Sequence, residues 1–222
     1  VTHRHMDHSP AAQPLAQRTG ASVYASAVPS RPSLCDTLRL EAGDDHNFEP
    51  GTDIQDGERF SGPGWTIEAV ATPGHTANHM AYALIEENAL FPGDHVMGWS
   101  TTVIGPPDGD MTAYMHSLEK VRAREFSTLW PTHGPPVTEN PSAFVQAYLD
   151  HRLDREAQII AQMKSGKTLI KDMVAEIYAD VDKRLHPAAC HSVLAHMIRL
   201  VDLKRVESLG PPCVDNMYVL AD

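Results

Sequence analysis

The chain begins with Thr2-His3-Arg4-His5-Met6-Asp7-His8, a run that places three imidazoles and one carboxylate within six positions. Residues two apart on an extended segment point to the same side, so His3 and His5 can hold one metal ion together. Asp7 and His8 lie in the loop that follows and can turn toward a second ion. A fold built on this run must bring further ligands to the start of the chain.

A solvated histidine-rich tail or tag remnant is the alternative interpretation, because the chain holds 13 histidines and clusters can arise by chance. The run alternates ligand types with other residues instead of repeating one residue. It also leads into Ser9-Pro10, a step typical of a turn. Both features favour a metal site on a loop over a tail.

Three later loops supply more ligand-type residues, and each loop follows a short apolar segment and is marked by glycine or proline. One such loop would be weak evidence, but the order of strand, tight loop and ligand occurs three times. The three are His75 in loop 72–76 after the predicted strand 65–71, Asp94 in loop 91–94 after a predicted hairpin with strands 80–85 and 89–91, and His133 in loop 131–135 after the segment 127–130.

Together these residues provide the ligands that a two-metal site needs. Two divalent ions about 3.5 Å apart take roughly six or seven protein ligands. Two zinc ions per chain are expected, and the same ligands also suit iron or manganese. The expected arrangement is a first ion on His3, His5 and His75, a second ion on Asp7, His8 and His133, and a bridge through Asp94.

The motifs His3-x-His5-x-Asp7-His8, His75, Asp94 and His133 resemble the ligand set of the metallo-β-lactamase superfamily. Within that superfamily, the loops around His75, Asp94 and His133 are most similar to the β-lactamase-like protein 2 group, whose members include a mitochondrial single-strand endoribonuclease. The resemblance runs from residue 2 to about residue 207. It implies an α/β (α+β) fold, the αββα sandwich of the family, followed by a C-terminal helical, winged-helix-like domain.

The start of the chain departs from the family pattern. In family members a block of strands precedes the first histidine motif, whereas only Val1 precedes it here. We therefore expect a fragment, with an N-terminally truncated metal-binding domain over residues 1–138 and the helical domain over 139–222. Thr132 stands where family loops usually have glycine, which affects the expected loop geometry but not the ligand.

Local patterns predict helices around and beyond the metal-binding loops. Asp110 and the pair Asn140-Pro141 are expected to start two of them as N-cap residues. The predicted elements are a short strand at 21–25, an irregular region over 29–56, helices over 11–18, 111–124, 141–163, 168–179 and 187–206, and a strand over 217–220. The C-terminal part is interpreted either as a lid over the active-site sheet or as an element that gates substrate or contacts RNA.

Other polar residues receive secondary roles. His79 is predicted to orient the His75 loop rather than to bind metal. His95 is interpreted either as an accessory polar group near the metals or as a residue facing a polar cavity. His191 and His196 are expected in helix packing or at the surface. A solvated face is expected for the basic residues Arg152, Arg155, Lys171, Arg199, Lys204 and Arg205.

Composition favours a cytoplasmic enzyme. The chain has no run of 18 apolar residues and no start resembling a signal peptide, so no membrane partner is expected. Cys35, Cys190 and Cys213 are far apart and lack C-x-x-C spacing, which predicts free thiols. The net charge of −11 disfavours a polyanionic partner, since phosphate binding usually requires a basic face.

The expected function is that of a zinc-dependent hydrolase that uses a metal-bridging hydroxide on an ester, thioester or phosphodiester. Asp7 and Asp94 are the expected catalytic residues, Asp94 by spacing the ions and Asp7 by orienting the hydroxide. The partner is then a small-molecule ester or thioester, or single-stranded RNA in the alternative function of an endonuclease. A non-catalytic nucleic-acid-binding module is the hypothesis from another class. The oligomeric state is not predicted.

Overall fold

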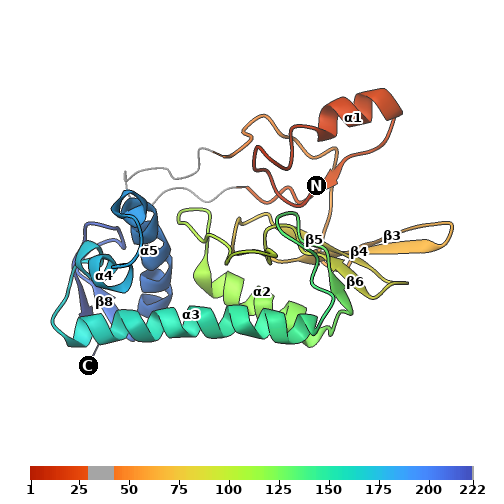
Figure 1. Cartoon of the computed structure of the whole chain (residues 1–222). Coiled ribbons are helices and arrows are strands. Elements are labelled where there is room, and N and C mark those ends of the chain that lie inside the picture. Colours follow the sequence, from red (N-terminus) through yellow and green to blue (C-terminus); the bar gives the residue numbers. More distant parts are fainter. Residues whose placement is uncertain (30–42, 222) are drawn as a thin grey trace.

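The computed structural model describes residues 1–29 and 43–221. Its elements form a sheet, two helices packed on one face of that sheet, and a C-terminal helical region (Figure 1). No helix among these residues is long and apolar enough to cross a membrane. In chain order the elements are α1 (Ala12–Thr19), β1 (Tyr24–Ala25), β2 (Thr52–Asp53), β3 (Arg59–Gly62), β4 (Trp65–Ala71), β5 (Met80–Leu84), β6 (Ala89–Phe91), α2 (Met111–Ala123), β7 (Thr128–Leu129), α3 (Pro141–Lys164), α4 (Ile170–Ile177), η1 (Lys183–Leu185), α5 (His186–Asp202), β8 (Val206–Ser208) and β9 (Tyr218–Leu220).

The central sheet has five strands in the order β3-β4-β5-β6-β7. The first four pair antiparallel and β7 pairs parallel to β6. The predicted strand over 65–71 and the hairpin around Asn88 are therefore confirmed. β4 is buried on both faces near its C-terminal end, where Ala69 and Val70 are both fully covered. This buried end of the sheet leads directly into the His75 loop.

Helix α2 covers one face of the sheet and begins as the sequence predicts. The Asp110 side chain accepts a hydrogen bond from the backbone N–H of Ala113, which satisfies a free donor of the first turn. Leu118 and Tyr114 of α2 pack in one core with Val70 and Leu90 of the sheet. The N-terminal segment with α1 lies on the opposite side of the sheet (Figure 1), where Ile54 packs on Ala69.

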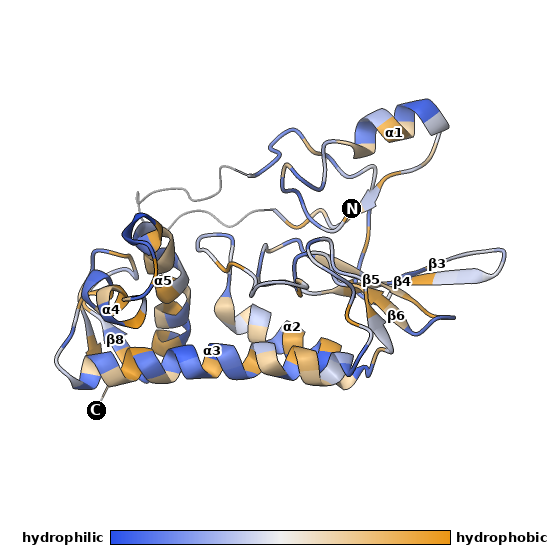
Figure 2. Ribbon diagram, viewed as in Figure 1, coloured by the Kyte–Doolittle hydropathy of each residue, from blue (hydrophilic) through white to orange (hydrophobic). Residues whose placement is uncertain are grey.

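Helix α3 joins the two parts of the molecule. Its first half packs on α2 through Val145 and Leu149, and its second half packs in a separate core through Ile159 and Met163. Figure 2 shows apolar and polar residues interspersed along its whole length. Helix α3 thus contributes to the core under the sheet and to the core of the C-terminal helices. The domain boundary predicted after residue 138 stays a prediction.

Several predictions for the C-terminal part need correction. Asn140 makes no side-chain cap and has a left-handed backbone with φ 47°, so α3 begins at Pro141 without it. The helix predicted to reach Val206 ends at Asp202, because Val206 pairs with Leu220 in the hairpin β8–β9. Arg152, expected on a solvated face, is only 3% exposed.

The N-terminal part is less regular than predicted. The strand expected over 21–25 is limited to Tyr24–Ala25, which pairs parallel to β2 in a separate two-stranded sheet. Much of the predicted irregular region, residues 30–42, lies outside the described residues. The free-thiol prediction is correct for the buried Cys190 and wrong for Cys213, which is disulfide-bonded, while Cys35 lies outside the described residues.

Candidate metal centre

The N-terminal histidine segment is held beside the sheet by hydrogen bonds at its first residues. The Tyr82 hydroxyl donates to the Val1 carbonyl at 2.7 Å, and the Met80 backbone N–H donates to the Thr2 carbonyl at 2.8 Å. These contacts fix His3 next to the start of β5, where it is fully buried. The segment therefore takes part in the folded structure, which excludes the interpretation as a solvated tail.

Close approach of the Asp94 loop to this segment depends on Gly93. Gly93 has φ +55°, and a Cβ there would lie 2.8 Å from His79 Nε2 and 3.0 Å from the Thr2 side chain. Glycine tolerates both the conformation and the contact, whereas other residues do not. The Gly93-Asp94 step thus allows the carboxylate to reach the histidines.

Three imidazoles form the first half of the site. His5 Nδ1 lies 2.9 Å from His3 Nε2 and 3.2 Å from His75 Nε2. The other nitrogen of His75, Nδ1, lies 2.7 Å from the Val103 carbonyl and must donate to it, because a carbonyl only accepts. In the neutral ring, His75 Nε2 therefore presents its lone pair to the other two histidines, as a metal ligand does.

The second half of the site combines two histidines with two carboxylates. His133 Nε2 lies 3.2 Å and His8 Nε2 lies 3.4 Å from Asp7 Oδ2. The same two nitrogens lie 3.5 Å and 3.4 Å from Asp94 Oδ1. The second oxygen of Asp94, Oδ2, faces the first half, 3.8 Å from His75 Nε2. One carboxylate thus has an oxygen toward each half.

These donors fit two divalent cations. All seven predicted ligands fall into groups whose donor atoms lie within 4.8 Å of one another: His3, His5 and His75; His3, His8 and Asp94; and Asp7, His8 and His133. The buried atoms His8 Nε2 and Asp94 Oδ1 make no hydrogen bond within the described residues. Buried polar atoms without partners are rare, and a set of nitrogen and carboxylate donors suits zinc, iron or manganese.

The surroundings of three site histidines, His3, His5 and His75, favour their neutral forms, and those of Asp94 favour its charged form. Burial first, and then the neighbouring histidines, lower the pKa of His3; burial and the charge of His75 lower the pKa of His5 to about 4. Burial alone would raise the pKa of Asp94, but the nearby imidazoles, His8 first and then His75 and His133, outweigh it and lower that pKa. Neutral imidazoles and an ionised carboxylate are the forms that bind metal.

The metal-free chain should lose stability as the pH falls from about 6.5 toward 4. When folding lowers the pKa of a histidine, the unfolded chain binds a proton at a higher pH than the folded chain does. Stability is therefore full above the pKa of the histidine in the unfolded chain, and it falls as protons bind the unfolded chain. For His5, a shift from 6.5 to about 4 corresponds to a loss of about 3 kcal/mol by pH 4. Urea unfolding of chelator-treated protein at several pH values measures this loss. If the free energy of unfolding of His5→Gln fell as steeply with pH as that of the unaltered chain, the assignment of the loss to His5 would be wrong.

His79 connects the two loops that carry His75 and Asp94. The Asp94 backbone N–H donates to His79 Nε2 at 3.1 Å, so His79 Nδ1 carries the proton and donates to Thr72 Oγ1 at 2.8 Å. Both contacts are buried. His79 belongs to none of the three ligand groups found among the described residues. Its position agrees with the predicted orienting role.

Replacing His79 with alanine should weaken metal binding about 10- to 100-fold, the usual cost of removing a group that orients ligands. The physical reason is that the Asp94 backbone loses its acceptor and the two loops lose their link. Competition with a chromogenic chelator measures the affinity. His116→Ala, at an exposed position of α2, is the matched control and should bind metal like the unaltered chain. Equal affinity in both variants would exclude the orienting role.

His95 is fully buried, with its ring 5.0 Å from the Tyr114 ring between centroids. The Tyr114 hydroxyl donates to the His95 carbonyl at 2.8 Å. Burial lowers the pKa of His95 to about 3. Because it lies in none of the ligand groups and packs on an aromatic ring, we assign it to the support of the Asp94 loop.

Helix α3 also holds the loop after Asp94, through Tyr148, for which the sequence predicted no role, and Arg152, which was predicted on a solvated face. The Tyr148 hydroxyl lies 2.6 Å from the carbonyls of Met97 and Ser100. One turn later, the Arg152 guanidinium donates to the Thr102 carbonyl, while Thr102 Oγ1 donates to the Asp94 carbonyl at 2.7 Å. The sequence signal was the helical spacing itself, which puts Arg152 on the apolar face of α3 defined by Val145, Leu149, Ile159 and Met163.

Comparison with known proteins decides the family. The family model of the Metallo-beta-lactamase superfamily matches residues 1–133, more than half of the 222 residues. The chain belongs to the metallo-beta-lactamase superfamily. A second family model, the Beta-lactamase associated winged helix domain, matches residues 170–211, which span α4, η1, α5 and β8. The predicted family and the predicted α/β fold class with a helical winged-helix region are therefore confirmed.

Three curated relatives are 30–34% identical to the chain. A Beta-lactamase-like protein 2 homolog from Caenorhabditis elegans is 34% identical over 156 residues, covering 70% of this chain and 51% of the relative. The Drosophila melanogaster homolog is 30% identical over 208 residues, covering 90% and 66%. An atrochrysone carboxyl ACP thioesterase from Aspergillus chevalieri is 31% identical over 154 residues, covering 66% and 48%. The chain thus spans about half to two thirds of these relatives' length.

Solved structures show the same fold. A metallo-beta-lactamase family protein from Thermus thermophilus superposes with a TM-score of 0.65 at 20% identity, covering 78% of this chain and 55% of that one. A beta-lactamase domain protein from Burkholderia ambifaria gives a TM-score of 0.68 at 18% identity, covering 77% and 52%. At these identities the likeness extends to the fold alone.

Proposed function

We propose that this metallohydrolase binds two zinc ions and hydrolyses thioesters. The observation that carries the proposal is the Asp94 carboxylate, which has Oδ2 3.8 Å from His75 in the first half of the site and Oδ1 3.4 Å from His8 in the second. When bound, two divalent ions would polarise the substrate carbonyl and lower the pKa of a water molecule toward neutrality. Water then adds to the carbonyl carbon, the carbon–sulfur bond breaks, and the products are a carboxylate and a thiol.

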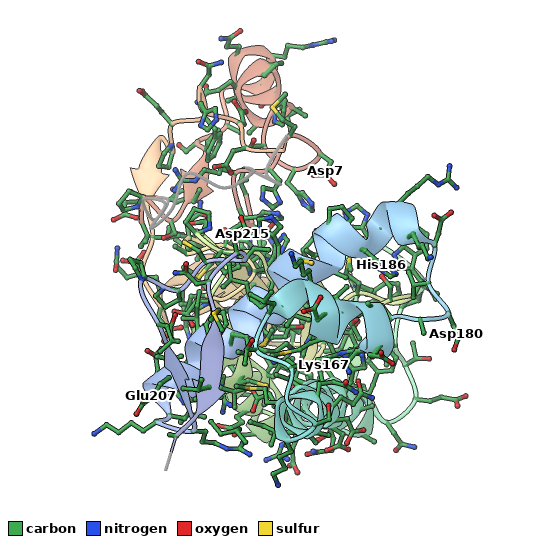
Figure 3. The ribbon with its side chains drawn as sticks, turned by 90° about the vertical axis from the view of Figure 1, so that its left-hand side faces the viewer. Asp7, Lys167, Asp180, His186, Glu207 and Asp215 are labelled. Atoms are coloured by element: carbon green, nitrogen blue, oxygen red, sulfur yellow. The ribbon has the colours of Figure 1, made fainter. Side chains whose placement is uncertain are left out.

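The chain's own side chains hold this chemistry in place. Asp94 is oriented through its backbone by His79, and His75 is oriented by the Val103 carbonyl. Asp7 differs from the other ligands because its side chain is 60% exposed, so it can accept a hydrogen bond from an attacking water molecule. Figure 3 shows its side chain pointing away from the body of the molecule. We assign catalytic roles to Asp7 and Asp94 for these reasons.

A thioester is favoured over RNA by charge and by one relative. The Aspergillus chevalieri relative is named as a thioesterase. The net charge is −11, and acidic and basic side chains are equal in number over the winged-helix match, residues 170–211. Proteins that bind nucleic acid gain most of their affinity from an excess of basic groups along the phosphates. The charge therefore disfavours RNA cleavage and non-catalytic nucleic-acid binding, which are the two alternatives to be tested.

Metal analysis and substrate assays test the proposal together. We expect two divalent ions per chain, and thioester hydrolysis that a chelator removes and zinc restores. Single-stranded RNA should be neither cleaved nor bound tightly. Asp180→Ala, an exposed carboxylate of the helical region, serves as the control variant and should retain full activity. A chain that binds no metal and cleaves no thioester would overturn the proposal, and metal-dependent cleavage of RNA alone would select the endonuclease instead.

A further inference from the structure

The loop that follows Asp94 presents two large apolar side chains to solvent beside the metal centre. Trp99 is 71% exposed and Val103 is 61% exposed. Neither side chain belongs to the ligand groups of the metal centre. Apolar groups held in water next to a polar reaction centre are typical of a surface that binds part of a ligand.

Trp99 is fixed against a metal-site residue. Its ring stacks on the His133 ring, with 6.3 Å between centroids and 15° between planes. The Gly98 backbone N–H donates to the His133 carbonyl at 2.7 Å, which ties the two loops together. A Cβ at Gly134, where φ is +93°, would lie only 2.7 Å from Gly98 Cα, so the close approach requires glycine. The indole therefore has a defined position at the second half of the site.

Val103 lies at the other half, because its carbonyl accepts the hydrogen bond from His75 Nδ1 at 2.7 Å. The loop between the two apolar residues is braced by Tyr148, whose hydroxyl lies 2.6 Å from the Ser100 carbonyl, and by Arg152, which donates to the Thr102 carbonyl. A loop held by buried helix residues keeps its backbone in place without a bound ligand. Such a surface loses little conformational entropy when a ligand binds.

We propose that Trp99 determines substrate specificity by binding a planar, apolar acyl group of the thioester, with Val103 at the other end of the same loop. This inference rests on the proposed function and adds the class of acyl group to it. An aromatic acyl group stacked on the exposed face of the indole gains both burial and ring stacking. The indole adjoins His133, so a substrate stacked there extends toward the two carboxylates, where its carbonyl would react.

Hydrolysis of two N-acetylcysteamine thioesters, 2-naphthoyl and acetyl, tests the assignment by kcat/KM. Trp99→Ala should lower the value for the naphthoyl thioester about 10-fold or more and change the acetyl value less than about 2-fold, since stacking and burial are lost only for the large group. Trp99→Phe keeps an aromatic ring and should retain most of the preference. Trp65→Ala, at a 42% exposed position in the β3–β4 hairpin, is the matched control and should leave both values unchanged.

A binding measurement separates this inference from the proposed function. The naphthylmethyl thioether of N-acetylcysteamine cannot be hydrolysed, and calorimetry on the chelator-treated chain should show affinity that Trp99→Ala weakens about 10-fold. This result would support the acyl site even if no thioester were cleaved. Equal binding by Trp99→Ala and the unaltered chain would overturn it. The inference would also be overturned if a labelled single-stranded octaribonucleotide bound more tightly than the thioether and its binding were lost in Trp99→Ala. The indole would then stack on a base and not on an acyl group.

Discussion

Replacing Asp94 with alanine is expected to lower kcat/KM on the order of 1000-fold and to reduce the bound metal from two ions to one or fewer. Among the described residues, this carboxylate is the one group with an oxygen toward each half of the site, so its loss removes a ligand from both. Two-metal stabilisation of a transition state is worth several kcal/mol, and each 1.4 kcal/mol is about a factor of ten in rate. Metal analysis by mass spectrometry and thioester kinetics measure the two effects.

Asp94→Asn keeps the shape of the side chain and separates charge from packing. It should fold like the unaltered chain, because the backbone N–H of residue 94 still donates to His79 Nε2. It should nevertheless lose metal and activity, since an amide is a poorer ligand than an ionised carboxylate. If Asp94→Asn kept both ions and more than about a tenth of the activity, the bridging role would be wrong. A tenfold loss of rate corresponds to an activation free energy raised by about 1.4 kcal/mol.

The candidate site could be predicted from sequence because four ligands lie in one short run and the other three, His75, Asp94 and His133, each follow a strand in a glycine-marked loop. His75, Asp94 and His133 lie beside the N-terminal run in space for a simple reason: loops at one end of a sheet converge, whatever their separation in the chain. Strong local signals also gave the Asp110 cap and the hairpin at Asn88. These features depend on residues close in sequence, which is where pattern and propensity are informative.

The features that sequence did not predict depend on tertiary contacts. Arg152 is a charged residue and was expected in water, but the Thr102 carbonyl and the Tyr114 ring give it partners inside the protein. Asn140 has the right residue type for a cap, yet its left-handed backbone turns the side chain away from that role. Val206 continues a helical pattern but pairs with Leu220 from a later strand. In each case a distant partner or the local backbone overrides the residue's usual preference.

A buried carboxylate on α3 is expected to matter for stability, and its removal should cost about 3 kcal/mol or more of the free energy of unfolding. Glu156 is 2% exposed, and its two oxygens accept hydrogen bonds from Arg199 Nη1 at 2.8 and 2.9 Å. His196 Nδ1 lies 3.4 Å away. In Glu156→Leu the guanidinium of α5 would remain with no anion beside it, and breaking a buried pair from one side is strongly destabilising.

Urea unfolding measures the loss of unfolding free energy in Glu156→Leu, and two further variants show whether the loss comes from the buried ion pair. Glu176→Gln is the matched control, because Glu176 is 59% exposed and 3.6 Å from Lys167, a surface pair worth less than about 1 kcal/mol. Glu156→Leu combined with Arg199→Met should recover much of the stability, since apolar replacements of both partners avoid an unpaired charge. A Glu156→Leu variant no less stable than Glu176→Gln would mean that water reaches Arg199 and that α3 and α5 are held by their apolar contacts alone.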